Sequence, residues 1–307
     1  MTAIVPESLA RYEAALPELE ELMATLHLDN WNISIGDGHK LVVMAGMNVL
    51  EDAAMAMDVA RHLKSVCAKH DLPFIFKASF DKANRSSIKS YRGPGMEKGL
   101  RILADVKQAL NVPVVTDIHT EEQAVPVAAV ADVVQIPAFL SRQTDLVVTA
   151  ARAVDASGGW LQIKKGQFLA PWDCKNILSK IGEVSKRPMT ILCERGVSFG
   201  YNNLVVDMLG LSEMRNLGAP VTMDATHAVQ LPGADPRTQG ASAGGRRAGV
   251  PVLARSAVAA GVDGIFLEFH PDPDKALCDG PSCLALDSAE ALLADLVAID
   301  AIVKRKA

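Results

Sequence analysis

Eight short apolar runs, each followed by a polar loop, constrain the fold of this sequence more than any other feature. They span Leu41–Met44, Phe74–Phe76, Val112–Val115, Asp132–Ile136, Trp160–Ile163, Met189–Cys193, Pro220–Met223 and Gly264–Leu267. Segments with helical periodicity follow most of them, at Ala53–Lys69, Met96–Leu110, Thr144–Ala156, Cys174–Val184 and Ala289–Val303. A strand followed by a helix is the repeating unit of α/β proteins with parallel sheets. Eight such units predict a closed (β/α)8 TIM barrel.

An open, doubly wound sheet is the structural alternative. The usual sign of that fold is Gly-x-Gly-x-x-Gly at the first strand-to-helix turn. Here that turn reads Ala45-Gly46-Met47-Asn48, which lacks the pattern. The sequence therefore favours the barrel.

The segment before Leu41 has a different pattern. Residues 7–26 place leucines among glutamates at helical spacing, which predicts an amphipathic helix that Pro17 weakens. Residues 31–35, a turn at 36–38 and residues 40–43 predict a small hairpin that runs into the first core strand. We expect an N-terminal extension with a helix and a β-hairpin over residues 1–40, and one barrel domain over residues 41–307.

Composition limits the partners and the compartment. The 307 residues are 49% hydrophobic with a net charge of −5, which disfavours nucleic acid and anionic membranes as partners. The five cysteines contain no Cys-x-x-Cys pair, so neither a disulfide framework nor a structural zinc site is expected. We also expect no secretory signal and no membrane span. A reducing cytoplasm fits this pattern best.

Polar or charged residues follow every apolar run, at the ends where barrel enzymes carry their chemistry. In chain order they are Asn48, Lys77 with Lys82, Asp117 with His119, Gln135, Lys164 with Lys165, Glu194 with Arg195, Asp224 with His227, and Glu268 with His270. Burying so many charges costs several kcal/mol each unless a ligand or ion pairing compensates. The pattern predicts a ligand site.

Several cations gather at or just after the strand ends, although the protein is acidic. The stretch Phe76–Ser87 turns from an apolar strand into a basic loop, and Lys77, Lys82, Arg85, Lys164 and Arg195 are the cations that we assign to the site. Each phosphate brings about −1.5 to −2 charges, so two small phosphorylated substrates would match them. Two of these positions have alternative interpretations. Lys165 could simply point to solvent, and Arg195 could pair with Glu194 in a structural ion pair.

Three loops add weaker indications. Gly93-Pro94-Gly95 and Gly244-Gly245-Arg246-Arg247 are rich in glycine, so their backbone amides are candidates for cradling phosphate. Residues 230–240 have the composition of a mobile loop, and we expect either a lid over the barrel mouth or a surface insertion.

Several longer motifs resemble the 3-deoxy-D-manno-octulosonate 8-phosphate synthase (KDO 8-phosphate synthase) family. The matching segments are 77–87, 93–95, 116–119, 135–140, 164–168, 199–207, 224–227 and 270–273. The resemblance runs from about Leu41 to the C-terminus. It implies a transferase that condenses phosphoenolpyruvate with D-arabinose 5-phosphate and releases phosphate, on the pathway to the inner sugar of lipopolysaccharide. It also implies a homotetramer of barrels.

The resemblance also implies that different residues of the site bind the two substrates. Phosphoenolpyruvate would contact Lys77, Lys82, Gln135, Lys164, Arg195 and His227. The pentose phosphate would contact Asn84, Arg85 and Ser86, together with Arg142 from a neighbouring subunit. The expected catalytic roles are polarisation of the aldehyde by Lys82, proton transfer by His227, and contacts to sugar hydroxyls by Asn48 and Asp117. Glu268 and Asp279 complete the substrate-binding set.

The family has two chemical versions, of which one binds a divalent metal through a cysteine, a histidine, a glutamate and an aspartate. The last three match His227, Glu268 and Asp279, but Asn48 stands where the cysteine would be. A carboxamide is a poor substitute for a thiolate as a zinc ligand. We expect the metal-independent version with no cofactor, and leave weak adventitious metal binding open. Cys278 precedes Asp279 but is not expected to be a ligand.

The sequence is also compatible with two alternative functions. The related 3-deoxy-D-arabino-heptulosonate 7-phosphate synthases use erythrose 4-phosphate and carry Lys-Pro-Arg-Thr-Ser where this chain has Lys82-Ala83-Asn84-Arg85-Ser86. This difference favours the five-carbon sugar. A non-catalytic sugar-phosphate-binding barrel would keep the phosphate donors, but it would not need Lys82 or His227.

Overall fold

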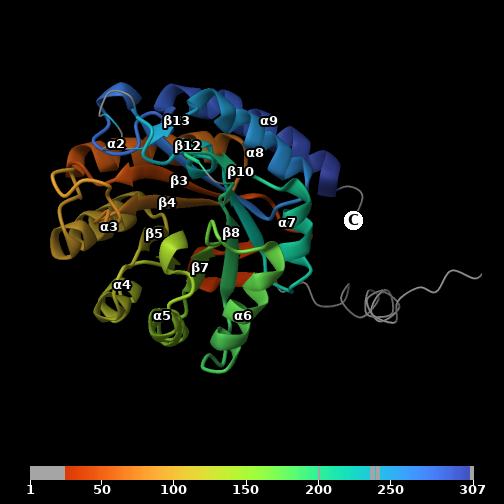
Figure 1. Ribbon diagram of the computed structural model, residues 1–307. Coiled ribbons are helices and arrows are strands. Elements are labelled where there is room, and N and C mark those ends of the chain that lie inside the picture. The colour runs from red at the N-terminus through yellow and green to blue at the C-terminus, as the bar shows by residue number, and fades with distance from the viewer. Residues whose placement is uncertain (1–24, 200, 236–238, 240–242, 305–307) are drawn as a thin grey trace, which may run out of the picture.

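Eight parallel strands close into a barrel in the computed structural model, which describes residues 25–199, 201–235, 239 and 243–304 (Figure 1). They are β3 (Val42–Val49), β4 (Phe74–Ser79), β5 (Val114–Asp117), β6 (Val133–Ile136), β7 (Trp160–Lys164), β8 (Thr190–Glu194), β11 (Val221–Asp224) and β14 (Gly264–His270). Each strand pairs with the next, and β14 closes the ring by pairing with both β11 and β3. The predicted barrel is confirmed, and the open-sheet alternative is wrong.

Helices surround the barrel, as Figure 1 shows. They are α2 (Ala53–Lys69), α3 (Met96–Leu110), α4 (Ala124–Ala128), α5 (Thr144–Ser157), α6 (Cys174–Gly182), α7 (Met208–Arg215), α8 (Val250–Ala259) and α9 (Ala289–Lys304). Local signals fix their ends. The Asp52 side chain accepts a hydrogen bond from the backbone N–H of Met55 at the start of α2, and α3 ends at Asn111 in the left-handed conformation. None of the helices in the described ranges is long and apolar enough to cross a membrane.

Short elements decorate the carboxyl ends of the barrel strands. Two-residue ladders join β9 (Val197–Ser198) to β10 (Leu204–Val205) and β12 (Gln230–Leu231) to β13 (Gly244–Gly245), and β15 (Leu284–Ala285) extends β14. Single 3-10 turns lie at Asp29–Trp31, Glu121–Gln123, Ala138–Leu140, Pro171–Asp173, His227–Val229, Arg247–Gly249, Pro273–Lys275 and Leu286–Ser288. All of them except the turn at Asp29–Trp31, which belongs to the N-terminal hairpin, lie in the loops that follow the barrel strands.

The N-terminal hairpin differs from the predicted one. Strand β1 (Leu26–Leu28) pairs antiparallel with β2 (Ile33–Ile35), whereas the sequence predicted pairing of residues 31–35 with the first core strand. A 3-10 turn followed by Asn32 at φ 51° reverses the chain between β1 and β2. Leu26, expected at the end of a helix, therefore lies in a strand. The rest of that predicted helix, residues 7–24, lies outside the described residues.

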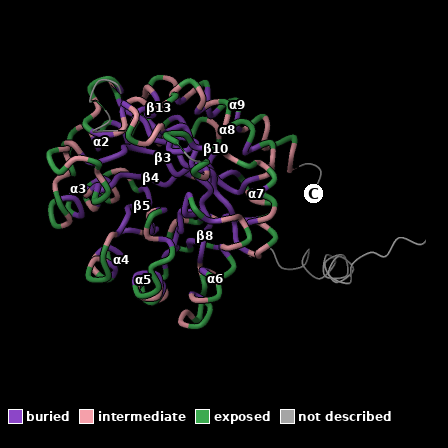
Figure 2. Tube along the Cα trace, viewed as in Figure 1, coloured by how far each residue is buried: buried purple, intermediate pink, exposed green. Residues whose placement is uncertain are grey.

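The core has two parts, and Figure 2 shows the buried strands inside the more exposed helices. One part fills the space between the barrel and its helices. The other lies inside the barrel, where Leu28 and Ile35 of the hairpin pack in one cluster with Val133, Trp160 and Phe266 of the strands. The hairpin thus contributes to an apolar floor below the polar residues of the strands.

Candidate active site

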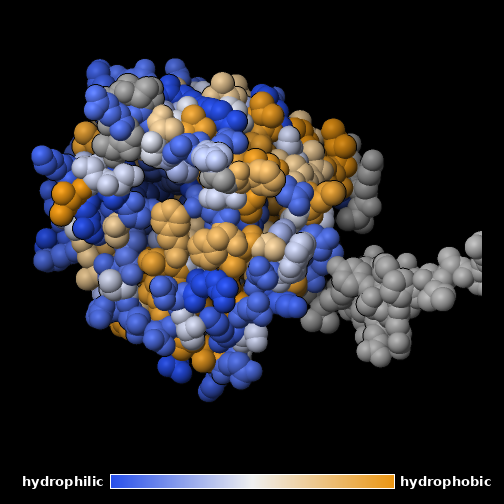
Figure 3. Space-filling model, in the orientation of Figure 1, coloured by the Kyte–Doolittle hydropathy of each residue, from blue (hydrophilic) through white to orange (hydrophobic). Residues whose placement is uncertain are grey.

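The main cavity lies at the carboxyl ends of the barrel strands, and Figure 3 shows a hollow with polar side chains at its rim. Four cationic side chains line the cavity: Lys82, Arg85, Lys164 and Arg195. Six more of the predicted site residues line it as well: Asn84, Ser86, Asp117, Gln135, His227 and Asp279. Residues from seven of the strands and their loops therefore meet in one place, as parallel strand ends in a barrel must.

Lys82 and Asp117 both line this cavity, and their charges interact. Burial lowers the pKa of Lys82, but Asp117 and Glu268 more than offset that effect, so the pKa lies above its usual value. Burial raises the pKa of Asp117, but Lys82 and His119 hold it well below the usual range. Both groups are therefore charged at neutral pH. The Oδ1 atom of Asp117 is buried without a hydrogen-bond partner among the described residues, whereas Oδ2 lies 3.2 Å from Nε2 of His119.

Lys77 lies behind the cavity wall and makes three hydrogen bonds there. Its ammonium group donates to the carbonyl oxygens of Met47 at 3.1 Å and Asn48 at 2.8 Å, and to Oε1 of Glu268 at 2.5 Å. Burial lowers the pKa of Lys77 to about 8, although Glu268 opposes the shift. An ammonium group has three N–H donors, and all three are in use. Lys77, predicted to contact a substrate, is thus not among the residues that line the cavity.

A close approach of two backbones makes this arrangement possible. A Cβ atom on Gly46 would lie 2.0 Å from the carbonyl oxygen of Lys77, so only glycine fits there. The register between β3 and β4 then shifts between Gly46 and Val49. Such an irregularity re-aims the groups that follow it. Here the carbonyl oxygens of Met47 and Asn48 are directed at the Lys77 ammonium group.

The side chain of Asn48 forms the centre of a buried polar cluster. Its Nδ2 atom lies 2.5 Å from Oε2 of Glu268, 3.1 Å from Oδ2 of Asp279 and 3.3 Å from Nε2 of His227. These three residues match the metal ligands of the other family version, and all of them face an amide donor. A donor N–H group at this point does not fit a cation. No group of three or more His, Cys, Asp or Glu residues in the described ranges is arranged to hold a metal ion.

His227 is held in one orientation by Asp224. The ring atom Nδ1 lies 2.6 Å from Oδ2 of Asp224, and the backbone N–H of His227 donates to Oδ1 at 2.9 Å. Burial lowers the pKa of His227 despite the opposing effect of Asp224, so the ring is neutral. A neutral ring that donates from Nδ1 leaves Nε2 as an acceptor, and this is the atom that faces the Asn48 amide. Asp224 also accepts a hydrogen bond from Lys164 at 2.5 Å.

The neighbouring lysines Lys164 and Lys165 point in different directions. Lys164 lines the cavity, whereas Lys165 is fully buried elsewhere, 3.0 Å from the carbonyl oxygen of Leu169 and 3.4 Å from Oε2 of Glu194. Side chains alternate along a strand, so two successive lysines must face opposite sides. Of the two, only Lys164 can reach a ligand in this cavity, and Lys165 does not point to solvent.

Arg195 does not form the side-chain ion pair with Glu194 that was kept as an alternative. The Glu194 carboxylate instead accepts the backbone N–H groups of Arg195 at 2.8 Å and Gly196 at 2.5 Å. The Arg195 guanidinium donates to Oε1 of Gln230 at 2.7 Å and lines the cavity. The bond from Glu194 fixes the backbone, and the bond to Gln230 directs the guanidinium.

The rim of the cavity carries the loop after β4. Arg85 donates to the Sγ atom of Cys278 and lies 3.8 Å from Oδ1 of Asp279, and Asn84 and Ser86 are exposed beside it. Arg142 is exposed and does not line the cavity of its own chain. The structure thus brings together every predicted sugar-phosphate contact except the one assigned to a neighbouring subunit.

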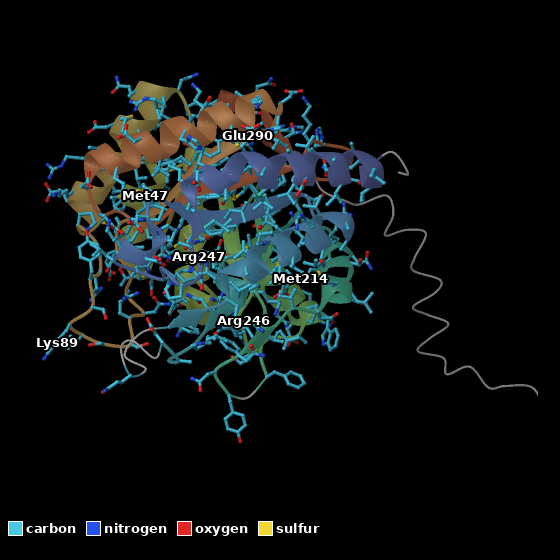
Figure 4. The ribbon with its side chains drawn as sticks, turned by 90° about the horizontal axis from the view of Figure 1, so that it is seen from above. Met47, Lys89, Met214, Arg246, Arg247 and Glu290 are labelled. Atoms are coloured by element: carbon cyan, nitrogen blue, oxygen red, sulfur yellow. The ribbon has the colours of Figure 1, made fainter. Side chains whose placement is uncertain are left out.

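The structure bears differently on the two glycine-rich loops that were candidates for phosphate binding and on the loop over residues 230–240 that was a candidate lid. Pro232 and Gly233 line the cavity, while residues 236–238 and 240 of the predicted lid lie outside the described residues. The backbone N–H of Gly95 already donates to the carbonyl oxygen of Phe80, and Gly93–Gly95 does not line the cavity. Arg246 and Arg247, labelled in Figure 4, do not line it either, because Arg247 binds Asp274 and the carbonyl oxygen of Gly280. Neither glycine-rich segment lines the main cavity, and phosphate binding by their backbone amides stays a prediction.

The cavity lining includes four side chains with N or S atoms to which the sequence assigned no specific role: His119, Gln167, Gln230 and Cys278. His119 was identified with Asp117 as a strand-end residue, but without a role. Cys278 is adjacent to Asp279, but sequence adjacency does not say which side chains face a cavity. Burial raises the pKa of the Cys278 thiol well above its usual value, so the group is a neutral neighbour of Arg85.

Comparison with known proteins gives one consistent result. The model of the DAHP synthetase I family matches residues 15–305. A protein of Geotalea uraniireducens, named 2-dehydro-3-deoxyphosphooctonate aldolase, is 56% identical over 273 residues, which cover 89% of this chain and 97% of the relative. Proteins with the same name from Pseudomonas fluorescens and Shewanella denitrificans are 54% and 50% identical, over 89% and 93% of this chain and 94% and 97% of their own lengths.

Proposed function

This chain belongs to the DAHP synthetase I family, and from that premise we propose that it condenses phosphoenolpyruvate with D-arabinose 5-phosphate and water. The products are 3-deoxy-D-manno-octulosonate 8-phosphate and inorganic phosphate. The similar proteins named 2-dehydro-3-deoxyphosphooctonate aldolase carry another name for this enzyme. The reaction supplies the inner sugar of lipopolysaccharide, and we propose that it takes place in the cytoplasm, in line with five cysteines that are all free and buried.

One observation carries the proposal: the cavity has two sets of anion-binding groups. Lys164 and Arg195 belong to barrel strand ends, whereas Arg85, Asn84 and Ser86 belong to the rim loop. Two phosphorylated substrates need two such sets. Cationic and amide donors bind phosphate and carboxylate oxygens strongly when they are fixed in a site shielded from water.

The proposed chemistry needs orientation and charge stabilisation more than a strong base. The enol carbon of phosphoenolpyruvate forms the new bond to the aldehyde carbon, whose oxygen takes up a proton. Water adds to the resulting cationic carbon and loses a proton, and phosphate leaves with cleavage of its C–O bond. Lys82, whose raised pKa keeps it charged, is the group that polarises the aldehyde oxygen.

Two further groups have proposed roles in this scheme. Neutral His227 carries an acceptor at Nε2 and suits removal of the proton from water. The Oδ1 atoms of Asp117 and Asn48 have no hydrogen-bond partner within the described part of the chain, and they are acceptors suited to sugar hydroxyl groups. Buried acceptors without partners cost free energy, so a ligand that donates to them would bind more tightly.

We further propose that the chain acts without a metal ion, and Asn48→Cys tests this. A thiolate at this position would face His227, Glu268 and Asp279 and supply the missing soft ligand. We expect the variant to retain about one equivalent of zinc after dialysis, as measured by elemental analysis. Asn48→Ser, which removes the amide without adding a thiolate, is the control and should retain no more than the unaltered protein. Equal metal contents in the Cys and Ser variants would contradict the proposed role of Asn48.

The proposed homotetramer would complete the rim. Exposed apolar side chains, Phe139, Phe168, Trp172, Phe199 and Leu209, follow neighbouring strands on one side of the mouth. Figure 3 shows apolar groups gathered over the region of β7 and β8. Apolar surface of this kind suits contact with a second copy, which would also bring the exposed Arg142 of a neighbour toward the sugar phosphate.

Comparison of two aldose phosphates tests the choice of substrate. The protein is incubated with phosphoenolpyruvate and either arabinose 5-phosphate or erythrose 4-phosphate, in excess chelator, and phosphate release is measured. We expect release with arabinose 5-phosphate only. Release only with erythrose 4-phosphate would indicate the heptulosonate synthase, and release with neither would favour the binding protein.

A further inference from the structure

Gln162 is a fully buried polar side chain in the barrel interior that the proposed chemistry does not use. It lies on β7 two residues before Lys164 and two after Trp160, so it faces the barrel interior just above the apolar floor. Burying a primary amide next to apolar side chains costs free energy unless its hydrogen bonds are made. The partners of Gln162 therefore indicate why an amide stands there.

Those partners form a chain of hydrogen bonds across three strands. The Nε2 atom of Gln162 donates to Oε1 of Gln135 at 2.8 Å, and these residues stand opposite each other in the ladder between β6 and β7. The Oε1 atom of Gln162 accepts a hydrogen bond from the Thr222 hydroxyl at 3.3 Å. Both ends of the Gln162 amide are thus in use, with the donor end directed at Gln135.

This polarity decides what Gln135 presents to the cavity. Because its oxygen is occupied by Gln162, the remaining end of the Gln135 amide is Nε2, with its N–H donors. Gln135 lines the cavity beside the cations Lys164 and Arg195. No described residue accepts a hydrogen bond from this Nε2 atom. If the amide were turned over, its oxygen would face the bound anion and repel it.

We infer that Gln162 is a positioning residue, which fixes the Gln135 amide so that its N–H groups face the anionic groups of phosphoenolpyruvate. The inference rests on the proposed function, and adds to it the residue that sets the orientation of one ligand contact. An amide whose two ends are held by neighbours is pre-organised, and pre-organisation lowers the cost of binding.

A double-mutant cycle tests this inference through the affinity for phosphoenolpyruvate, measured by calorimetry. Gln162→Leu keeps the side-chain size and removes the bond to Gln135, so we expect the Kd of phosphoenolpyruvate to rise about tenfold. The KM of arabinose 5-phosphate should stay within about twofold, because Gln162 acts only through Gln135. In a Gln135→Met background, Gln162→Leu should change the Kd by less than about twofold, since its target is gone.

Thr190→Val is the matched control. It also removes one buried polar group, the Thr190 hydroxyl, which has no hydrogen-bond partner among the described residues, and it should leave the Kd unchanged. Equal effects of Gln162→Leu in both backgrounds, or no effect in the unaltered background, would overturn the inference and leave the proposed function intact. Failure of the unaltered protein to bind phosphoenolpyruvate would overturn the proposed function itself.

Discussion

Lys82→Met should reduce kcat by roughly 10²- to 10³-fold, the usual effect of removing one fixed group that stabilises developing charge. Lys82 lines the cavity, and Asp117 and Glu268 keep it charged despite its burial. In the proposed reaction this charge polarises the aldehyde oxygen while the new carbon–carbon bond forms. Steady-state kinetics with saturating phosphoenolpyruvate and arabinose 5-phosphate measure the change.

Lys89→Met is the matched control for Lys82→Met. Lys89 belongs to the same loop after β4, but Figure 4 shows it at the outer tip, away from Met47 on the barrel strand. It is exposed and does not line the main cavity. We expect kcat of this variant to remain within about twofold of the unaltered value. A similar kcat for the two variants would show that Lys82 has no special role.

Lys77→Met should destabilise the fold by about 3–5 kcal/mol, because it leaves a buried carboxylate without its partner. The ammonium group of Lys77 is the closest cation to Glu268, at 2.5 Å, and both side chains are almost fully buried. It also satisfies the carbonyl oxygens of Met47 and Asn48. Urea unfolding at pH 7 measures the loss of stability.

A second variant separates the charge effect from lost packing. In Lys77→Met with Glu268→Gln, no uncompensated carboxylate remains, so we expect most of the lost stability to return. If the loss of stability in the double variant equals the sum of the losses in the two single variants, Lys77 and Glu268 are not energetically coupled. If Lys77→Met lowers the free energy of unfolding by less than about 1 kcal/mol, the ion pair between Lys77 and Glu268 contributes no more than an exposed pair does. This result would contradict the importance that we assign to its burial.

The fold could be predicted from the sequence because its signal is local and repeated. Each apolar run such as Trp160–Ile163 is short and buried, and the helical period that follows it is visible without any knowledge of the partner strands. The N-terminal hairpin was placed wrongly because its register depends on one left-handed residue, Asn32, and on packing under the barrel. Neither is a local pattern.

The site could be predicted as a set of residues, but its internal arrangement could not. Strand-end position identifies Lys77 and Lys164 equally, yet the ammonium group of Lys77 is taken up by Glu268 and by the carbonyl oxygens of Met47 and Asn48, and it does not line the cavity. Likewise, Glu194 binds backbone N–H groups instead of the Arg195 guanidinium. Which partner each side chain binds depends on the distances between strands that are far apart in the sequence. Only the folded structure defines these distances.

The product of the reaction tests the central claim most directly. Mass spectrometry follows an incubation of the protein with phosphoenolpyruvate and arabinose 5-phosphate in excess chelator. We predict one new eight-carbon keto-acid phosphate, formed in equal amount with inorganic phosphate. Pyruvate together with unchanged arabinose 5-phosphate, or both substrates unchanged, would contradict the assignment of this chain as a condensing enzyme.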